Sequence, residues 1–224
     1  KIVNFFLKKK YLKKFINFST PEVYGDNKKK LNEETFFNPS TPYALSRASA
    51  DTHMKLMNKY KKFPIIFTRA ANVYGPHQQL YRIVPKTIMM LLKKKRVPID
   101  GNGLTFRSFI HINDVNKALY KILQYGKTGE TYHISTSDYI SILDLVKKII
   151  KIFKKKNNFD KYIFYKKDRV GKDEFYKLSS RKIIKNLKWK PTINIDDGIK
   201  DVIEWIQKNY KYLIKSKLTY HHKK

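Results

Sequence analysis

Two short segments near the start of the chain combine hydroxyl, carboxylate and phenol side chains in a pattern that could move protons. The first is Ser-Thr-Pro-Glu-Val-Tyr-Gly at residues 19–25, directly after the apolar run 15–18. Such a run predicts a strand, and open α/β sheets hold their ligands at the carboxyl ends of their strands. Thr20 and Glu22 therefore occupy a position typical of a site.

The second segment, Pro-Tyr-Ala-Leu-Ser-Arg-Ala at residues 42–48, predicts the start of a helix. Tyr43 and Arg47 are four residues apart, so a helix places them one turn apart on one face. A tyrosine needs about 4 kcal/mol of differential charge stabilisation to act as a base at neutral pH, and a fixed cation could supply part of it. The spacing alone also fits an ordinary surface helix, so the pair needs further support.

These side chains must be positioned by strands and helices, which alternate along the chain. Short β-branched or aromatic runs occur at residues 15–18, 65–68 and 132–134, with helical patterns between them. This alternation predicts an α/β fold with a mainly parallel sheet.

Several helices can be placed by their apolar periodicity. Ser141 precedes an apolar face of 3.6-residue period over residues 142–153, and Asp144 completes a capping pattern with it. The acidic pair at 196–197 stands where a helix start prefers negative charge, before the apolar positions of 199–206. Further helical patterns cover residues 2–12 and 84–92.

The composition limits the kinds of site that the chain can form. Its 224 residues are 42% hydrophobic, enough to bury a core. There are no cysteines, and the histidines show no ligand-like spacing beyond the adjacent pair at 221–222, so we expect no metal site. No uncharged apolar run approaches the length of about 18 residues that a membrane span needs. We therefore expect a cytoplasmic protein that does not bind membranes.

The net charge of +31 raises the alternative of a nucleic-acid-binding protein. Only seven of the 49 basic residues are arginine, however, and lysine triplets are scattered along the whole chain. That distribution indicates a lysine-rich surface rather than one nucleic-acid footprint, so we expect no specific nucleic-acid partner. An anionic substrate would still be attracted.

The order of several motifs resembles the extended short-chain dehydrogenases/reductases that act on nucleotide sugars, the NAD-dependent epimerase/dehydratase family. These motifs are residues 19–25, 42–48, Arg-Ala-Ala-Asn-Val-Tyr-Gly-Pro at 69–76, Gly-Asn-Gly at 101–103 and Arg-Ser-Phe-Ile-His-Ile-Asn-Asp-Val at 107–115. Within that family, Asp-Arg-Val-Gly-Lys-Asp at 168–173 and Leu-Lys-Trp-Lys-Pro at 187–191 are similar to the dTDP-glucose 4,6-dehydratases.

The resemblance implies NAD as the cofactor and assigns catalytic roles. Tyr43 matches the phenolate that takes the proton of the sugar C4 hydroxyl, and Arg47 stands where the family has a lysine that lowers the tyrosine pKa. Thr20 matches the hydroxyl that binds the C4 oxygen, and Glu22 the carboxylate that removes the C5 proton when water is eliminated. Residues implied to contact the cofactor are Ser19, Tyr43, Arg47 and Asn72.

The resemblance also implies a nucleotide-sugar site. Positions that match contacts to the diphosphate, base or sugar are Asn72, Arg82, Arg107, Arg169 and Tyr176. Arginine suits this role because its guanidinium can hold two phosphate oxygens at once; Arg107 and Arg169 also fit ordinary surface ion pairs.

Four positions depart from the family pattern. Pro21 replaces an aspartic acid that protonates the leaving C6 hydroxyl, and Arg47 replaces the lysine with a planar group of different reach. Asp100 stands where an aromatic residue stacks on the base, and His133 where asparagine is usual. The oxidation step is therefore a firmer expectation than the elimination step.

The resemblance predicts how the chain is divided. We expect residues 1–75, with a return segment at 108–136, to form the C-terminal part of an NAD-binding Rossmann domain. Residues 76–107 and 137–214 would form the substrate domain, and 215–224 a basic tail. No glycine-rich phosphate-binding loop occurs, and none of the eight glycines precedes Gly25. We therefore expect a fragment that lacks the NAD cradle and is inactive alone.

Two alternative functions remain at this point. A nucleotide-sugar 4-epimerase or decarboxylase needs the same oxidation by Tyr43 but no elimination at C6. A non-catalytic nucleotide-sugar or nucleic-acid binding protein is favoured by Arg47, Pro21 and the net charge. The resemblance also implies a homodimer formed through paired helices.

Overall fold

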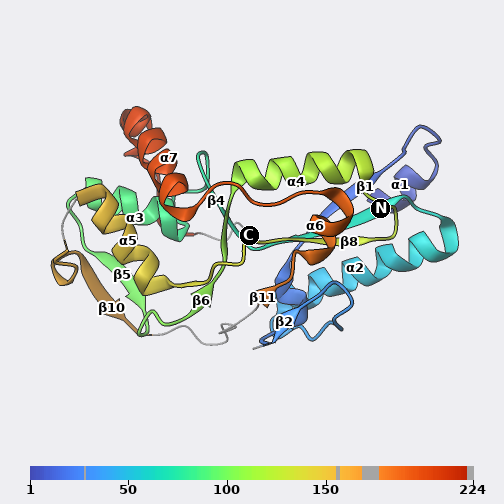
Figure 1. The fold of residues 1–224 in the computed structure, drawn as a ribbon, viewed down its shortest axis with the longest axis horizontal. Helices are drawn as coiled ribbons and strands as arrows, with labels where there is room; N and C mark the ends of the chain where they lie inside the picture. The colour runs from blue at the N-terminus through green and yellow to red at the C-terminus, as the bar shows by residue number, and fades with distance from the viewer. Residues whose placement is uncertain (28, 155–156, 168–176, 221–224) are drawn as a thin grey trace.

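The centre of the computed structural model is a parallel sheet of strands β1 (Phe15–Ser19), β3 (Ile65–Ala70) and β8 (Thr131–Ile134), in the order β1-β3-β8 (Figure 1). The structure describes residues 1–27, 29–154, 157–167 and 177–220. The register pairs Ser19 with Arg69 and Arg69 with His133. The predicted strands and the α/β class with a parallel sheet are confirmed.

Helices cover both faces of this sheet, as in a Rossmann-type fold. Figure 1 shows α4 (Ile112–Tyr125) along one face and α2 (Pro42–Lys61) along the other. Every residue of the middle strand β3 is buried, because a parallel strand covered on both sides has no solvent face. Its neighbour β8 is buried throughout as well.

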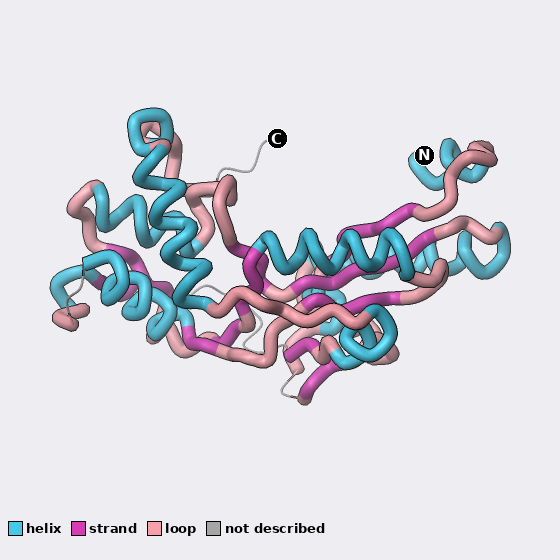
Figure 2. Tube along the Cα trace, turned by 45° about the horizontal axis from the view of Figure 1, so that its top comes forward, coloured by secondary structure: helices cyan, strands magenta, loops and turns pink. Residues whose placement is uncertain are grey.

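A second hydrophobic core lies away from the sheet. Helices α3 (Ile83–Leu92), α5 (Ile142–Lys154) and α7 (Ile195–Lys208) pack on one another and gather at the end of the molecule opposite the N-terminus (Figure 2). Strands β5 (Val97–Asp100) and β10 (Ile163–Lys166) form a parallel pair beside α3. The helices predicted at 84–92, 142–153 and 199–206 are thus confirmed.

Short strands and helices make up the other described elements. Three strand pairs join distant segments, and the remaining helices are brief. They are β2 (Lys30–Leu31) with β11 (Lys177–Leu178), β4 (Asn72–Tyr74) with β7 (Phe109–His111), β6 (Phe106–Arg107) with β9 (Ile140–Ser141), and α1 (Ile2–Leu7), η1 (Pro21–Tyr24), η2 (Asp160–Tyr162), α6 (Arg181–Leu187) and α8 (Tyr210–Leu213). Helix α6 packs Ile183 and Leu187 against the sheet cluster, while the division into two domains stays a prediction.

One helix is shorter than its pattern predicts. The prediction of a helix over 2–12 is wrong beyond Leu7, because the lysines at 8–10 give the helix no apolar side chain to bury. The chain turns there, and Leu12 packs beside Phe15 and Phe63 instead.

Side-chain caps fix the helix starts that the sequence indicated. The Asp144 amide donates to Ser141 Oγ over 3.0 Å, and Ser141 Oγ donates to Asp144 Oδ2 over 2.6 Å. Asn194, directly before α7, accepts from the Asp197 amide over 2.9 Å. Such caps satisfy amide groups that a helix start leaves without internal partners.

The tight packing of α7 on β4 generates a stability prediction. A Cβ at Gly198 would overlap the Tyr74 hydroxyl, whose oxygen is buried without a hydrogen-bond partner among the described residues. We expect Gly198→Ala to lower the free energy of unfolding by about 1–3 kcal/mol, although alanine favours helices. Adding Tyr74→Phe to Gly198→Ala should recover part of that loss. The unsubstituted protein, the two single variants and the double variant are compared by urea denaturation. Unchanged or raised stability of Gly198→Ala would contradict the packing.

Candidate active site

Thr20 and Glu22 lie at the carboxyl end of β1, on the short helix η1. Thr20 caps this helix, since its Oγ1 accepts from the Glu22 amide over 3.3 Å. Pro21 occupies the first helical position, where its fixed φ and missing N–H are tolerated. Gly25 ends η1 at φ 66°, and a Cβ there would overlap the Asn38 carbonyl oxygen. The departure at Pro21 thus has a local structural role.

Tyr43 and Arg47 lie on the first turns of α2, as predicted. Thr41 caps the helix by accepting from the Ala44 amide over 3.1 Å. The Tyr43 side chain is 56% exposed and can be reached by a ligand. Arg47 Nη2 donates to the Phe18 carbonyl over 2.7 Å, which ties the start of α2 to the end of β1. Helix α2 also contacts η1, so the two predicted catalytic segments are neighbours.

A buried ion pair lies beneath these segments. Asp51 of α2 and Arg69 of β3 have fully buried side chains, and Arg69 Nη2 lies 2.7 Å from Asp51 Oδ2. Asp51 also accepts from Asn17 Nδ2 over 2.8 Å and from Ser19 Oγ over 2.6 Å. One carboxylate of α2 therefore joins two strands of the sheet.

The ion pair continues to a tyrosine and a histidine. Arg69 Nη1 donates to Tyr24 Oη over 2.9 Å, and Tyr24 Oη shares a hydrogen bond of 2.7 Å with His133 Nε2. The Arg69 guanidinium also lies over the rings of Tyr24 and Phe37, at 5.1 and 4.9 Å. Burial raises the pKa of Tyr24 to about 12, and burial together with Arg69 lowers the pKa of His133 to about 3.

This buried cluster was not predicted as part of the site. Asp51 was not among the predicted site residues, and His133 was noted only as a departure from the family pattern. A signal was present: Arg69 is the charged residue in the otherwise uncharged strand Ile65–Ala70, and a buried arginine requires an acidic partner. What the sequence could not show is which carboxylate that partner is.

The structure places the other predicted residues in two groups. Ser19 ends β1 and Asn72 follows β3, at the same sheet edge as Thr20. Ser19 donates to Asp51, and Asn72 Nδ2 donates to the Ser108 carbonyl over 3.2 Å. Arg107 ends β6, and Arg82 precedes α3 with its guanidinium over the Tyr81 ring. Two further predicted residues, Arg169 and Tyr176, lie outside the described residues.

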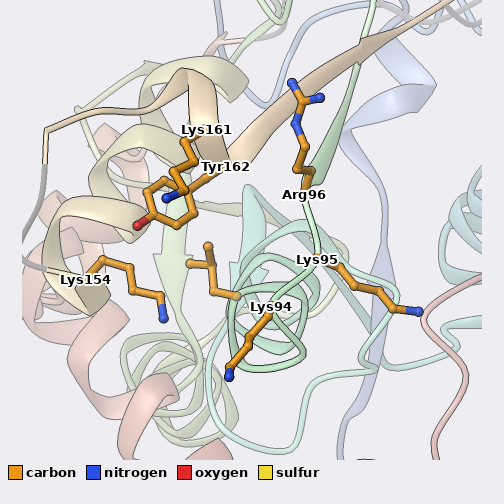
Figure 3. Close-up of a pocket in the computed structure, with 7 residues that line it drawn as sticks. Lys94, Lys95, Arg96, Lys154, Lys161 and Tyr162 are labelled. Carbon is orange, nitrogen blue, oxygen red and sulfur yellow. The ribbon is translucent and has the colours of Figure 1, made fainter.

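A basic hollow of about 180 Å³ lies far from this site, beyond the end of α3 (Figure 3). Its charged lining residues are Lys94, Lys95, Arg96, Lys154 and Lys161. Lys94 follows α3 and Lys154 ends α5, and cations are favourable at helix carboxyl ends. Arg96 donates to the Ile163 carbonyl. These roles account for Lys94, Lys154 and Arg96 without a ligand.

The described residues include neither a candidate membrane span nor a candidate metal site. None of their helices is both long enough and apolar enough to cross a bilayer. Likewise, within the described parts of the chain, histidine and acidic side chains nowhere gather in threes in an arrangement that could hold a metal ion.

The buried His133 generates a pH prediction. Its pKa is lowered from 6.5 to about 3 in the folded protein, so the unfolded chain takes up a proton first as the pH falls. Below about pH 6.5 the free energy of unfolding should therefore decrease by up to about 1.4 kcal/mol per pH unit. His133→Asn should flatten this dependence in urea titrations.

The control for this prediction is His53→Asn, at an exposed position of α2. It should leave the pH dependence of stability as in the unsubstituted protein. The same steep dependence in His133→Asn would show that burial of this imidazole does not disfavour its protonation.

Most of the chain is similar to known proteins. The family model described as GDP-mannose 4,6 dehydratase matches residues 3–202. The dTDP-D-glucose 4,6-dehydratase of Bos taurus is 37% identical over 203 residues, which cover 89% of this chain. The chain spans 57% of the length of that relative.

Solved structures agree with this relationship. The dTDP-glucose 4,6-dehydratase from Bacillus anthracis str. Ames in complex with NAD matches with a TM-score of 0.87 and 30% identity, over 94% of this chain and 67% of that one. The UDP-glucuronic acid 4-epimerase from Bacillus cereus in complex with UDP-glucuronic acid and NAD matches with a TM-score of 0.86 and 26% identity, over 93% and 66%. The chain therefore belongs to the GDP-mannose 4,6 dehydratase family of extended short-chain dehydrogenases/reductases.

Proposed function

We propose that this chain carries the catalytic residues of an NAD-dependent nucleotide-sugar 4,6-dehydratase of the dTDP-glucose 4,6-dehydratase type. The main support is the arrangement at the end of β1, where α2 brings Tyr43 and Arg47 next to η1 with Thr20 and Glu22. The bovine and Bacillus anthracis relatives named for this reaction support the same interpretation.

One side chain, Arg47, offers a hydrogen-bond donor that fits the cofactor. Arg47 Nε is buried and has no hydrogen-bond partner among the described residues. It can donate to an acceptor on a ligand, such as a hydroxyl of the nicotinamide ribose, while Nη2 stays on the Phe18 carbonyl. When bound, NAD would supply hydride transfer from and back to the sugar.

Different residues of the chain would carry out the separate proton transfers of the reaction. Tyr43 as phenolate accepts the proton of the sugar C4 hydroxyl, helped by the positive charge of Arg47. The Thr20 hydroxyl donates to the C4 oxygen. Once C4 has been oxidised to a ketone, the C5 proton becomes more acidic. Glu22 accepts that C5 proton as the C6 hydroxyl leaves. Arg107 and Arg82 are proposed to hold phosphate oxygens.

Pro21 means that the acid for the leaving C6 hydroxyl must come from elsewhere. Glu22, after it accepts the C5 proton, is a carboxylic acid that can donate it to the departing hydroxyl. One carboxyl group would then act first as base and then as acid.

An epimerase or decarboxylase is the second candidate, supported by the match to the UDP-glucuronic acid 4-epimerase. Both need Tyr43 and Arg47 for oxidation at C4, but neither needs a base at C5 with loss of the C6 hydroxyl. The proposals of a homodimer, of a cytoplasmic location and of no specific nucleic-acid partner stay predictions.

Product analysis tests the proposed function. The full-length protein is incubated with NAD and dTDP-glucose, and we expect the 4-keto-6-deoxy sugar nucleotide. Glu22→Gln should still reduce NAD at the expense of the sugar but form about 10²–10⁴-fold less 6-deoxy product. Tyr43→Phe is the matched control, which should lose both signals. A 4-epimer or a decarboxylated product from other nucleotide sugars would overturn the dehydratase proposal.

Arg47 gives a separate prediction, because it differs from the lysine of the family. We expect Arg47→Lys to remain active within about tenfold, since the charge is kept, whereas Arg47→Met should lose about 10²-fold or more in kcat/KM. Both are measured with the substrate that the product analysis identifies. Equal activity of Arg47→Met would show that this cation does not assist Tyr43.

A further inference from the structure

We infer that Asp51 is a positioning residue, whose buried carboxylate sets Tyr43 and Arg47 on α2 relative to Thr20 and Glu22 on η1. This inference rests on the proposed function and deepens it. It concerns a residue that does not touch the substrate but determines where the two halves of the site lie.

The first step is the geometry of α2. Tyr43, Arg47 and Asp51 are spaced by four residues, and each step of four advances only about 40° around the helix axis. The three side chains thus project from neighbouring positions on one side of α2. Because Asp51 accepts from Asn17 over 2.8 Å and from Ser19 over 2.6 Å, both on β1, the rotation of α2 about its axis is fixed against that strand.

The second step is the connection to η1. Asp51 receives Arg69 Nη2 over 2.7 Å, and the other guanidinium nitrogen donates to Tyr24 Oη over 2.9 Å. Tyr24 is the last residue of η1, two positions after Glu22. The hydrogen bonds from Asp51 through Arg69 to Tyr24 therefore form a rigid buried link between the two segments that carry the proposed catalytic groups.

Stability alone does not explain this arrangement. Both side chains of the ion pair are fully buried, so both lose their hydration, and apolar residues of similar volume often replace such pairs without loss of stability. What apolar residues cannot reproduce is direction: two guanidinium nitrogens and two carboxylate oxygens each hold a specific partner.

The decisive experiment replaces the pair by apolar residues, Asp51→Leu with Arg69→Met, in the full-length protein. We expect a folded protein with a Tm changed by no more than about 4 °C. Its kcat should fall about ten- to hundredfold with little change in KM, because the groups are misplaced rather than absent. A kcat within about twofold of the unsubstituted protein, measured per folded molecule, would overturn the inference.

The matched control is Asp114→Asn. Asp114 is also a fully buried aspartate, but it holds the Thr192 and Ile193 amides, each over 2.9 Å, away from the site. It should lower Tm without lowering kcat of the folded fraction. A comparable kcat loss here would mean that any buried aspartate has this effect and would overturn the specific role of Asp51.

A milder variant decides the matter if the double variant does not fold. Tyr24→Phe removes only the hydroxyl that joins Arg69 to η1. We expect a kcat lowered about three- to tenfold with little change in KM, since η1 loses its link to Arg69 while α2 is still held. An unchanged kcat would overturn the link.

The readout of Tyr43 also separates this inference from the proposed function. Tyrosine labelled with ¹³C at the ring carbon that bears the hydroxyl reports the surroundings of Tyr43 without turnover, assigned with Tyr43→Phe. In the double variant the chemical shift of this carbon should change, because α2 is no longer held against β1 by the Asp51 carboxylate. An unchanged chemical shift would overturn the inference, even if the substrate proves to be a different one.

Discussion

The buried ion pair between Arg69 and Asp51 determines where α2 can lie against the sheet. A charge in a parallel strand that is covered on both faces is tolerated only when a partner and further hydrogen bonds satisfy it. Here the partner comes from α2, so this helix must lie where its carboxylate meets β3. The pair has no solvent to relax into, and small displacements would leave a charge unsatisfied. The position of α2, and with it Tyr43 and Arg47, follows from that requirement.

The parallel sheet supplies the second constraint. Because β1, β3 and β8 run in the same direction, the residues that follow them leave the sheet at one edge. This collects Thr20 and Glu22 after β1 and Asn72 after β3, although the two segments are about fifty residues apart in the chain. Register then aligns Ser19, Arg69 and His133 in one row across the three strands. Thr20 and Glu22 follow Ser19 along the chain, so they begin where this polar row meets the sheet edge.

Much of this arrangement could be predicted from the sequence, because it depends on local patterns. Short β-branched or aromatic runs predicted β1, β3 and β8, and the segment 42–48 predicted the start of α2. Periodicity predicted α5, and the capping serine at 141 was confirmed by its hydrogen bonds. The end of α1 was missed, since helix propensity continues through the lysines while the burial that sustains a helix stops at Leu7. The Asp51 to His133 cluster was missed for another reason: its members are far apart in sequence, and only the fold decides which polar groups meet. The roles of the individual site residues stay predictions.

The hydrogen bond between Tyr24 and His133 has a direction that follows from its neighbour. A guanidinium has no acceptor, so Arg69 must donate to Tyr24 Oη, and the tyrosine proton is then left for His133 Nε2. The imidazole therefore carries its own proton on Nδ1, and donation runs one way from Arg69 through Tyr24 to His133. A second imidazole proton would face the tyrosine proton directly, with the guanidinium charge behind it. The polarity of this chain of hydrogen bonds, and not burial alone, keeps His133 neutral and fixes its tautomer.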